Sequence, residues 1–205
     1  MGFKRKINVS RKQLDIICGS ILGDAYVTKK GQIQFEQGAN QKDYLFWKYR
    51  ELSSISYGNP PKLVVRTDKR NGKITYSWRF WTRGLFSNLR SKFYPEGFKI
   101  FPKDLDLTDL SLAVWYMDDG WTENGRYFIS VQGFEQEYKN RILRQLEDKF
   151  NILATIKERG HLRIRSKSIP RFIQIVKPHI FRSLLYKLPN ADPVTTDSVA
   201  SDATG

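Results

Sequence analysis

The sequence has few of the residues that cross-link a chain or hold a metal in a closed cage. Cys18 is the only cysteine, so no disulfide can form within the chain. Two histidines, His161 and His179, accompany it, and three such residues cannot complete the four-ligand Cys and His sets of structural zinc sites. We interpret Cys18 and His179 as structural residues.

Long apolar runs are also missing. No stretch approaches the roughly 20 apolar residues that span a membrane. The first residues, MGFKRKINVSRKQ, carry charges with no apolar stretch behind them, which is unlike a secretory signal. We therefore expect an intracellular protein without membrane contact, either in an organelle (mitochondrion or chloroplast) or in a prokaryotic cytoplasm.

Negative charge is scarce, whereas positive charge is abundant. The chain has 35 Lys and Arg against 21 Asp and Glu, a net charge of +14. The segment from Asn190 onward has three aspartates and no basic residue, so the rest of the chain is more basic still. Such a balance favours polyanionic partners. The alternative is a solvated basic surface, and the residue pattern has to decide between them.

One order of elements occurs twice along the chain. In the first copy, Ser10 and Gln13 form a capping-box pattern ahead of a nearly all-apolar helix. Asn71-Gly72 is a strong hairpin turn between two alternating strands. The expected elements are a helix at Ser10–Asp24, a hairpin at Ala25–Lys29 and Gln32–Gln37, a helix at Gln41–Leu52, a hairpin at Lys62–Asp68 and Ile74–Thr82, and a helix at Leu85–Phe93.

The second copy starts near Leu107. Thr108 or Asp106 can cap its apolar helix, LSLAVWYMDDG, and Gly160 marks a tight hairpin turn. The expected elements after that helix are strands at about Arg126–Gln132, a helix at Glu135–Phe150, a hairpin at Ala154–Arg159 and His161–Arg165, and a helical region from Ser168 to about Lys187.

A common offset supports a true repeat. Asp24 and Asp119 are 95 positions apart, and the Gln-Gly pairs that begin at Gln37 and Gln132 have the same spacing. We therefore predict an α+β fold of two αββαββα halves packed as a pseudo-dimer. The expected parts are a basic arm at 1–9, a first half at 10–103, a second half at 104–190 and a disordered tail at 191–205.

Asp24 and Asp119 each end an apolar helix. The carboxyl end of a helix is partly negative, so a carboxylate there is disfavoured by roughly 0.3–1 kcal/mol. A bound cation would remove that cost, and Mg²⁺ takes one or two carboxylates together with phosphate oxygens. The alternative for a single aspartate is a loop cap or an arginine partner. Two aspartates at repeat-equivalent helix ends favour a metal site.

Gly19 and Gly23 lie four residues apart on the first apolar helix. Small residues at this spacing allow two helix backbones to approach closely, and tight packing alone would also account for them. If the two halves dock through their apolar helices, Asp24 and Asp119 meet near the pseudo-twofold axis. A two-metal phosphodiesterase requires that arrangement.

The expected strands alternate apolar residues with Lys, Arg, Gln, Ser and Thr, so one face covers the core and the other is free. Such side chains bond phosphates and base edges, and a β-ribbon fits the major groove of DNA. The alternative is an ordinary solvated sheet face. We expect His161 to face DNA or solvent rather than to act as a general base. The expected DNA contacts are Lys29, Gln32, Gln34, Glu36, Arg66, Lys69, Arg70, Lys73, Thr75, Ser77, Arg79, Arg126, Ser130, Gln132, Lys157, Arg159, His161, Arg163 and Arg165.

Two segments resemble one known motif. Residues 17–25 are ICGSILGDA and residues 112–120 are LAVWYMDDG, and both resemble the LAGLIDADG motif. The chain is therefore similar to the monomeric, two-motif LAGLIDADG homing endonucleases, of the intron-encoded kind found in the yeast mitochondrial large-rRNA gene. The likeness covers residues 10–190. The first motif departs from the pattern at four positions, which we expect to affect packing more than chemistry.

The resemblance implies motif helices at a central interface and antiparallel sheets that form a saddle over DNA. It implies sequence-specific hydrolysis of both DNA strands at a long asymmetric site. The cofactor it implies is Mg²⁺, with Mn²⁺ as a substitute and Ca²⁺ as an ion that binds without supporting cleavage. The acidic position of the family falls on Asp24 and Asp119, and the carbonyls of Gly23 and Asp118 are further candidate metal ligands.

Such enzymes also place a basic residue beside each active centre. Lys99 and Lys187 each lie shortly before a proline at the end of a half, and Lys187 belongs to the segment YKLP, which recurs near the end of related endonucleases. The resemblance therefore implies that these two lysines either polarise the surroundings of the attacking water or stabilise charge at the reacting phosphate.

Two other functions remain open. An RNA maturase or a DNA-binding regulator on the same fold would not cleave DNA, although both motif acids are present here and the roles can coexist. A nuclease of another class would need a His-Cys box or a GIY-YIG pair, and the sequence has neither.

Overall fold

The computed structural model describes residues 7–189. The predicted tail at 191–205 and most of the predicted arm at 1–9 lie outside these residues. The first half contains α1 (Arg11–Leu22), β1 (Tyr26–Val27), β2 (Ile33–Gly38), α2 (Lys42–Glu51), β3 (Lys62–Thr67), β4 (Ile74–Trp81) and α3 (Ser87–Phe93). The second half contains α4 (Asp109–Asp119), β5 (Gly120–Glu123), β6 (Arg126–Ser130), α5 (Gln136–Phe150), β7 (Ala154–Lys157), β8 (His161–Ile164) and α6 (Ile169–Val176).

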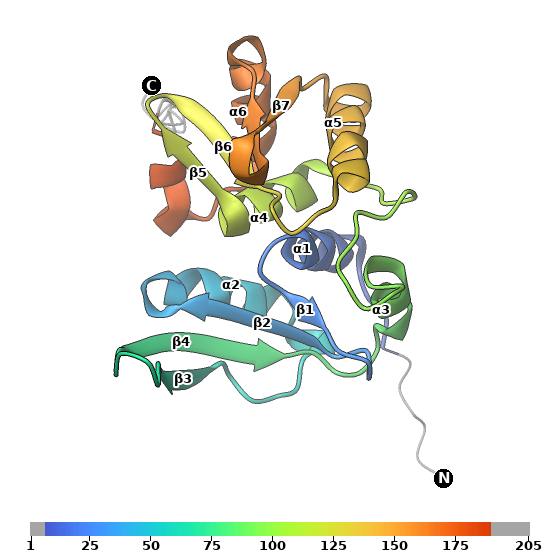
Figure 1. Cartoon of the computed structure of the whole chain (residues 1–205). Helices are drawn as coiled ribbons and strands as arrows, with labels where there is room; N and C mark the ends of the chain where they lie inside the picture. The colour runs from blue at the N-terminus through green and yellow to red at the C-terminus, as the bar shows by residue number, and fades with distance from the viewer. Residues whose placement is uncertain (1–6, 190–205) are drawn as a thin grey trace, which may run out of the picture.

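The α+β fold and its internal repeat are confirmed. The first half forms an antiparallel sheet in the order β1-β2-β4-β3, and the second half forms one in the order β5-β6-β8-β7, which is the same order. In Figure 1 the two sheets lie in separate layers on either side of α1 and α4. Within residues 7–189, no helix combines the length and apolar character that a membrane crossing requires.

The two motif helices begin as the capping patterns predict. Ser10 accepts a hydrogen bond from the amide of Gln13, whose side chain bonds back to the amide of Ser10. Thr108 and Ser111 form the same reciprocal pair at the start of α4, so Thr108 rather than Asp106 is the cap. A capping box satisfies two amides that the first turn leaves without partners.

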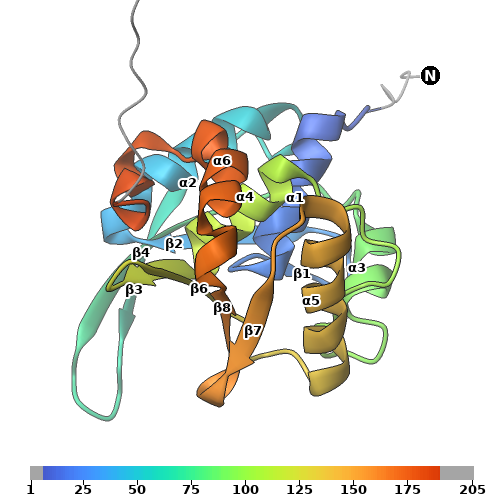
Figure 2. The same cartoon turned by 90° about the horizontal axis from the view of Figure 1, so that it is seen from above.

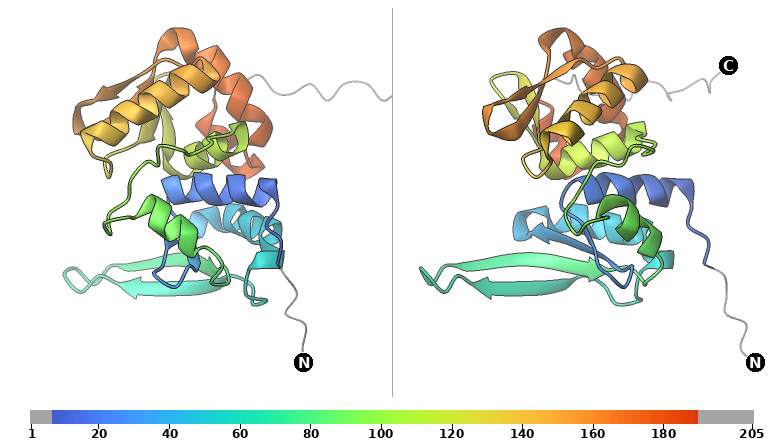
Figure 3. Two further views of the ribbon diagram at one scale, coloured as in Figure 1. Left: turned by 90° about the vertical axis from the view of Figure 1, so that its right-hand side faces the viewer. Right: turned by 45° about the vertical axis from the view of Figure 1, so that its right-hand side comes forward.

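The helices α1 and α4 pack side by side between the two sheets (Figure 3). A Cβ placed on Gly19 would lie 2.4 Å from the carbonyl oxygen of Ser111 and 2.8 Å from Cβ of Val114. A Cβ on Gly23 would lie 2.5 Å from that of Asp118. The two glycines therefore allow the close approach of the helices, as their spacing predicts.

A glycine is required at position 120, directly after α4, although this residue does not adopt the left-handed conformation that glycine often has at the end of a helix. Its φ is −92°, which any residue can adopt. A Cβ at this position would lie 2.1 Å from Cδ2 of Tyr116 and 2.4 Å from the carbonyl oxygen of the same residue. The glycine is needed because β5 starts directly against the last turn of α4.

Two sequence predictions of secondary structure differ from the structure. Strand β5, which starts at Gly120, was not predicted, because its four residues are too few to show an alternating pattern. The helical region from Ser168 to Lys187 is not one helix: α6 ends at Val176, and two 3₁₀ segments follow, η5 (Lys177–His179) and η6 (Arg182–Lys187). Pro178 has no backbone N–H to donate, and its ring clashes with the backbone of the preceding turn, so α6 cannot continue through it as a regular α-helix.

The outer half of the β3–β4 hairpin projects beyond the rest of the first half (Figure 2). The alternation in β4 predicts that one face covers the core. Phe80 does so, at 3% exposure, but Ile74 and Tyr76 on the same face are 50% and 51% exposed. Leu63 and Val65, on the partner strand, are 49% and 54% exposed. The core therefore covers only the inner half of this hairpin.

Candidate functional site

The two candidate acids meet where the motif helices end. Asp24 directly follows Gly23, the residue that caps the carboxyl end of α1, and Asp119 is the last residue of α4. Burial, together with the nearby carboxylates of Asp24 and Asp118, raises the pKa of Asp119 to about 7. The side-by-side packing of α1 and α4 therefore brings like charges together, as the symmetry of the repeat predicts.

The two candidate lysines contact the ends of the same helices. The ammonium of Lys99 donates hydrogen bonds to the carbonyl oxygens of Gly23 at 2.8 Å and Leu22 at 3.1 Å. The ammonium of Lys187 donates to the carbonyl oxygen of Met117 at 2.6 Å. Met117 is the repeat mate of Leu22, so each lysine binds the carboxyl end of the motif helix in its own half.

The same lysines lie beside the acids. Burial lowers the pKa of Lys99 and of Lys187, and the surrounding aspartates, Asp24 and Asp119 among them, oppose that shift. Both ammonium groups in turn lower the pKa of Asp119, against the larger effect of its burial. Four residues that the sequence singled out separately thus form one electrostatic cluster.

The structure adds two residues that the sequence interpretation missed. Nε2 of Gln37 donates to Oδ2 of Asp24 at 2.9 Å and to Oδ1 of Asp118 at 3.2 Å. The ammonium of Lys48, on α2, lies 2.7 Å and 2.9 Å from the two carboxylate oxygens of Asp118. A signal for Lys48 existed, because a lysine at this position interrupts the buried stripe of Tyr44, Leu45 and Leu52.

Two predicted metal ligands have other partners in the structure. The carbonyl oxygen of Gly23 accepts a hydrogen bond from Lys99. The side chain of Asp118 is buried against Lys48 and is 0% exposed, so it does not line an open site. Burial raises the pKa of Asp118, and the ammonium of Lys48 opposes the rise. The carbonyl of Asp118, the atom that the resemblance points to, stays a prediction.

The donor set fits a hard divalent cation. Among residues 7–189, no group of three or more His, Cys, Asp and Glu side chains could hold a metal by itself. Mg²⁺ does not need such a cage, because it binds through one or two carboxylates plus phosphate oxygens and water. Among the same residues, Asp119 accepts no hydrogen bond from a side chain and sits beside the carboxylate of Asp24. A cation between them would offset the repulsion.

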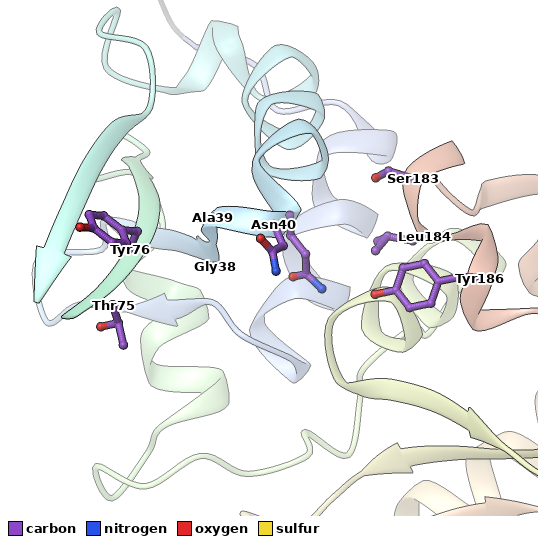
Figure 4. Close-up of a pocket in the computed structure, with 9 residues that line it drawn as sticks. Gly38, Ala39, Asn40, Thr75, Tyr76, Ser183, Leu184 and Tyr186 are labelled. Atoms are coloured by element: carbon purple, nitrogen blue, oxygen red, sulfur yellow. The ribbon is translucent and has the colours of Figure 1, made fainter. Parts of the chain in front are cut away.

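A pocket of about 680 Å³ lies between the first-half sheet and η6 of the second half. Figure 4 shows Asn40 and Thr75 on one side of it and Tyr186 on the other. Gly38 and Tyr186, which line it, directly adjoin Gln37 and Lys187 in sequence, but none of the candidate acids and lysines lines it. Its residues are Gly38, Ala39, Asn40, Gln41, Thr75, Tyr76, Ser183, Leu184 and Tyr186.

The first-half sheet carries an ordered cluster of charge on its free face. Glu36 bonds Arg66 and accepts from Nε of Arg79 at 2.7 Å and from the hydroxyl of Ser77 at 2.5 Å. Burial alone would raise the pKa of Glu36, but these three hydrogen bonds lower it to about 2. Glu36 thus orders the two arginines on this face, and it is not a free acceptor for a DNA base.

The other predicted contacts of the first half lie on the same face, at the tip of the β3–β4 hairpin or, for Lys29, in the turn between β1 and β2. Nε2 of Gln34 donates to Oε2 of Glu36 at 3.1 Å, and Nε2 of Gln32 donates to the hydroxyl of Tyr57 at 2.9 Å. Arg70 bonds Asp68 at the tip of the β3–β4 hairpin. The remaining predicted contacts are exposed, and they are Lys29, Lys69, Lys73 and Thr75.

The second-half sheet presents the predicted basic face and two aromatic residues on it. Cross-strand pairing puts Trp121 opposite Phe128, and Phe128 opposite Arg163, so all three share one face. The rings of Trp121 and Phe128 stack at 5.2 Å, and His161 meets Trp121 edge-on at 4.9 Å. The strand register places Arg126, Ser130 and Lys157 on the same face, whereas Gln132 and Arg165 lie just beyond the ends of β6 and β8.

Arg159 also lies outside the strands of the second half. It lies in η3 (Glu158–Gly160) with a φ of +67°, in the left-handed region. Strand alternation therefore does not extend through this turn, and it does not determine which face Arg159 occupies.

Comparison with known proteins agrees with this geometry. The model of the LAGLIDADG DNA endonuclease family matches residues 14–172. The chain is 31% identical to cytochrome b mRNA maturase bI2 of Debaryomyces hansenii, covering 89% of this chain and 75% of that protein. It is 31% identical to probable intron-encoded endonuclease 1 of Wickerhamomyces canadensis, covering 90% and 87%.

The solved structures include a close match in fold. The homing endonuclease I-WcaI bound to its DNA recognition sequence superposes with a TM-score of 0.81 at 30% identity, covering 90% of this chain and 89% of that one. The chain spans about half the length of another relative, cytochrome b mRNA maturase bI2 of Saccharomyces cerevisiae, with 47% of that protein covered at 33% identity.

Proposed function

The chain belongs to the LAGLIDADG DNA endonuclease family, and from that premise we propose that it hydrolyses both strands of duplex DNA at a long asymmetric site, using Mg²⁺. The observation that supports this most is the cluster at the helix ends. Asp24 and Asp119 lie together, and each helix end is bound by a lysine, the half-buried Lys99 or the buried Lys187. A structural protein gains nothing from gathering like charges in this way.

The acids and lysines have separate roles in this proposal. Asp24 and Asp119 would hold the divalent ions, with the carbonyl of Asp118 as a further ligand; the carbonyl of Gly23 would serve as one only if it accepted the ion beside its hydrogen bond from Lys99. When bound, such ions stabilise negative charge on the phosphate and lower the pKa of water. Lys99 and Lys187 are held by helix carbonyls, so their charges are already in place when negative charge builds up on the phosphate oxygens. Mn²⁺ substitutes for Mg²⁺, and Ca²⁺ binds without supporting cleavage.

The free faces of the two sheets bind the DNA. Arg66 and Arg79 are pre-ordered by Glu36 on one sheet, and Arg163 and Lys157 lie on the other. Phosphate contacts set the position of the duplex, and contacts to base edges in the major groove select the sequence. One chain with two unequal halves acts as a pseudo-dimer, which suits a target without symmetry.

The experiment that tests this function is selection of cleaved sites. The purified protein is incubated with a random or genomic DNA library and Mg²⁺, and the new ends are sequenced. We expect one long, asymmetric sequence to be enriched and cut on both strands. Enrichment of bound but uncut DNA under every divalent ion would instead support a DNA-binding protein without nuclease activity.

A role in RNA splicing is the second candidate, because two relatives are named mRNA maturases. The two roles can coexist in one chain, since DNA cleavage depends on Asp24 and Asp119 whereas RNA binding depends on side chains on the protein surface. A splicing assay with the host intron tests it. Faster splicing by wild-type protein, retained by a variant that has lost cleavage, would establish an independent maturase role.

A further inference from the structure

A buried ion pair joins the two halves beside the candidate site. Lys48 lies on α2 of the first half and Asp118 at the end of α4 in the second, and their side chains are 1% and 0% exposed. The ring of Tyr44 lies 4.5 Å from the ammonium of Lys48, which further encloses the charge. Two charges removed from water in this way depend on each other, because either one alone would be buried without a counter-charge.

The pair is connected to Asp24 through one amide. Gln37 is 4% exposed, and its Nε2 donates to Asp24 at 2.9 Å and to Asp118 at 3.2 Å. An amide nitrogen carries two hydrogens, so one group can serve both carboxylates at once. The ammonium of Lys48 therefore binds both carboxylate oxygens of Asp118. The carboxylate of Asp118 accepts a hydrogen bond from the side-chain amide of Gln37, and the same amide donates a hydrogen bond to the carboxylate of Asp24.

The second half has no equivalent of this chain of contacts. The repeat mate of Lys48 is Leu143, which carries no charge, and the repeat mate of Asp118 is Gly23, which has no side chain. Gln132, the repeat mate of Gln37, faces Nε2 of His161 at 3.4 Å instead of an acid. Among residues 7–189, no side chain donates a hydrogen bond to Asp119. The support is therefore one-sided.

We propose that Lys48 is a positioning residue that acts through Asp118 and Gln37 on the Asp24 side of the site alone. Each DNA strand is then cut by a different active centre, and only one of the two centres has an acid positioned by these contacts. This rests on the proposed function, with one centre for each strand. A bridge that only tied the halves together would, when broken, weaken both cuts equally. The ratio of the two strand-cleavage rates therefore separates a positioning role from a structural one.

The experiment uses a duplex that carries the selected site, with a different fluorophore on each strand. Lys48→Met removes the charge at similar side-chain length. We expect it to slow one strand by about tenfold to a hundredfold more than the other, since small misplacements of reacting groups have effects of that order. Nicked duplex should accumulate. Lys48→Arg keeps the cation and should return the ratio toward the wild-type value.

The matched control breaks an exposed ion pair between the halves. Arg11, on α1, bonds Asp106, ahead of α4, and their side chains are 60% and 57% exposed. Arg11→Ala removes this exposed contact away from the acids, so the ratio of strand rates should equal that of the wild type. Equal slowing of both strands by Lys48→Met would overturn the proposal.

A second variant covers the case in which Lys48→Met does not fold, because that change leaves Asp118 buried without its partner. Lys48→Met/Asp118→Leu removes both charges, and replacing a buried pair with apolar residues is commonly tolerated. Gln37 still loses its second acceptor in this variant, so the same strand bias is expected. Loss of that bias would contradict the proposal.

A measurement without DNA or metal tests the link independently of cleavage. The side-chain amide signal of Gln37, identified by its disappearance in Gln37→Glu, is recorded by NMR. It should shift in Lys48→Met and stay in place in Arg11→Ala, and an unshifted signal in Lys48→Met would overturn the proposal. Wild-type protein that cuts neither strand would instead contradict the proposed function, and the amide signal then decides alone whether Lys48 holds Gln37.

Discussion

Asp119 occupies a position that disfavours its own negative charge. Burial and the carboxylates of Asp24 and Asp118 raise its pKa, whereas Lys99 and Lys187 lower it by less. The ammonium groups of both lysines donate hydrogen bonds to helix carbonyl oxygens, so they do not fully neutralise the carboxylates. At the scale of single residues, repulsion between the carboxylates exceeds the attraction from the lysines, and this favours the binding of an added cation.

Substitution of the acids tests this directly. Asp24→Asn and Asp119→Asn keep the size of each side chain and remove the charge, so DNA binding should be retained while cleavage falls by about 10²–10³-fold or more. Binding is measured by gel shift in Ca²⁺ and cleavage in Mg²⁺. Asp106→Asn is the control, because Asp106 is an exposed acid that bonds Arg11 and Lys149 away from the site. Cleavage near the wild-type rate by either site variant would refute the assignment.

Glu36 predicts a dependence of stability on acid pH. Its pKa in the folded protein is about 2, against an ordinary value of 4.5, so the folded state binds this proton less readily than the unfolded chain does. The stabilisation is present above about pH 4.5 and is lost as the pH falls toward 2. The face is partly open to solvent, so the contribution is about 1 kcal/mol.

Urea unfolding at a series of pH values measures the effect of Glu36. Wild-type protein should lose more stability between about pH 5 and pH 2.5 than Glu36→Gln, because the variant has no proton to take up at this site. Parallel curves for the two proteins would show that the cluster with Arg66 and Arg79 does not stabilise the fold.

At the scale of elements, the contact of α1 with α4 determines where the acids meet. Gly19 and Gly23 lie four positions apart along α1 and its cap, and both lie where a side chain would collide with α4. The carbonyl of Ser111, which faces Gly19, belongs to the helix backbone and cannot move aside alone. The distance between the helices, and with it the distance between the acids, therefore depends on these glycines.

Gly19→Ala should destabilise the protein by about 1–3 kcal/mol, the usual effect of overpacking a close interface. It should also reduce cleavage in the protein that remains folded, because it pushes the helix ends apart. Gly133→Ala is the matched control, since a Cβ there would meet nothing within 4 Å. Thermal unfolding and cleavage are measured for both, and similar stability of the two variants would contradict the packing argument.

At the scale of the whole molecule, a net charge of +14 and two basic sheet faces make DNA binding strongly dependent on salt. The logarithm of the binding constant should fall linearly with the logarithm of salt concentration. Lys157→Ala, on the exposed face of β7, should reduce that slope by about 1 if the lysine contacts a phosphate. Lys103→Ala removes an exposed lysine beside α5 and should leave the slope unchanged. Equal slopes for wild type and Lys157→Ala would remove Lys157 from the interface.

The sequence by itself determined the repeat, the helix caps and the acids, because these signals are local. Ser10 with Gln13 and Thr108 with Ser111 act within one turn of helix, and the 95-residue offset of Asp24 and Asp119 is visible in one dimension. Strand boundaries followed from alternation wherever a strand was long enough to show it. The intracellular location and the ends of the halves stay predictions.

Only the tertiary structure decided how the two halves differ at their shared centre. Lys48 and Asp118 are 70 positions apart and come from different halves, so no periodicity could pair them. The exposed outer half of the β3–β4 hairpin depends in the same way on how far α2 reaches along the sheet. Such contacts depend on how the two halves dock, and docking is set by the shapes of many side chains together. For this reason Asp24 and Asp119 could be identified as a pair from the sequence, whereas the one-sided support of Asp24 could not.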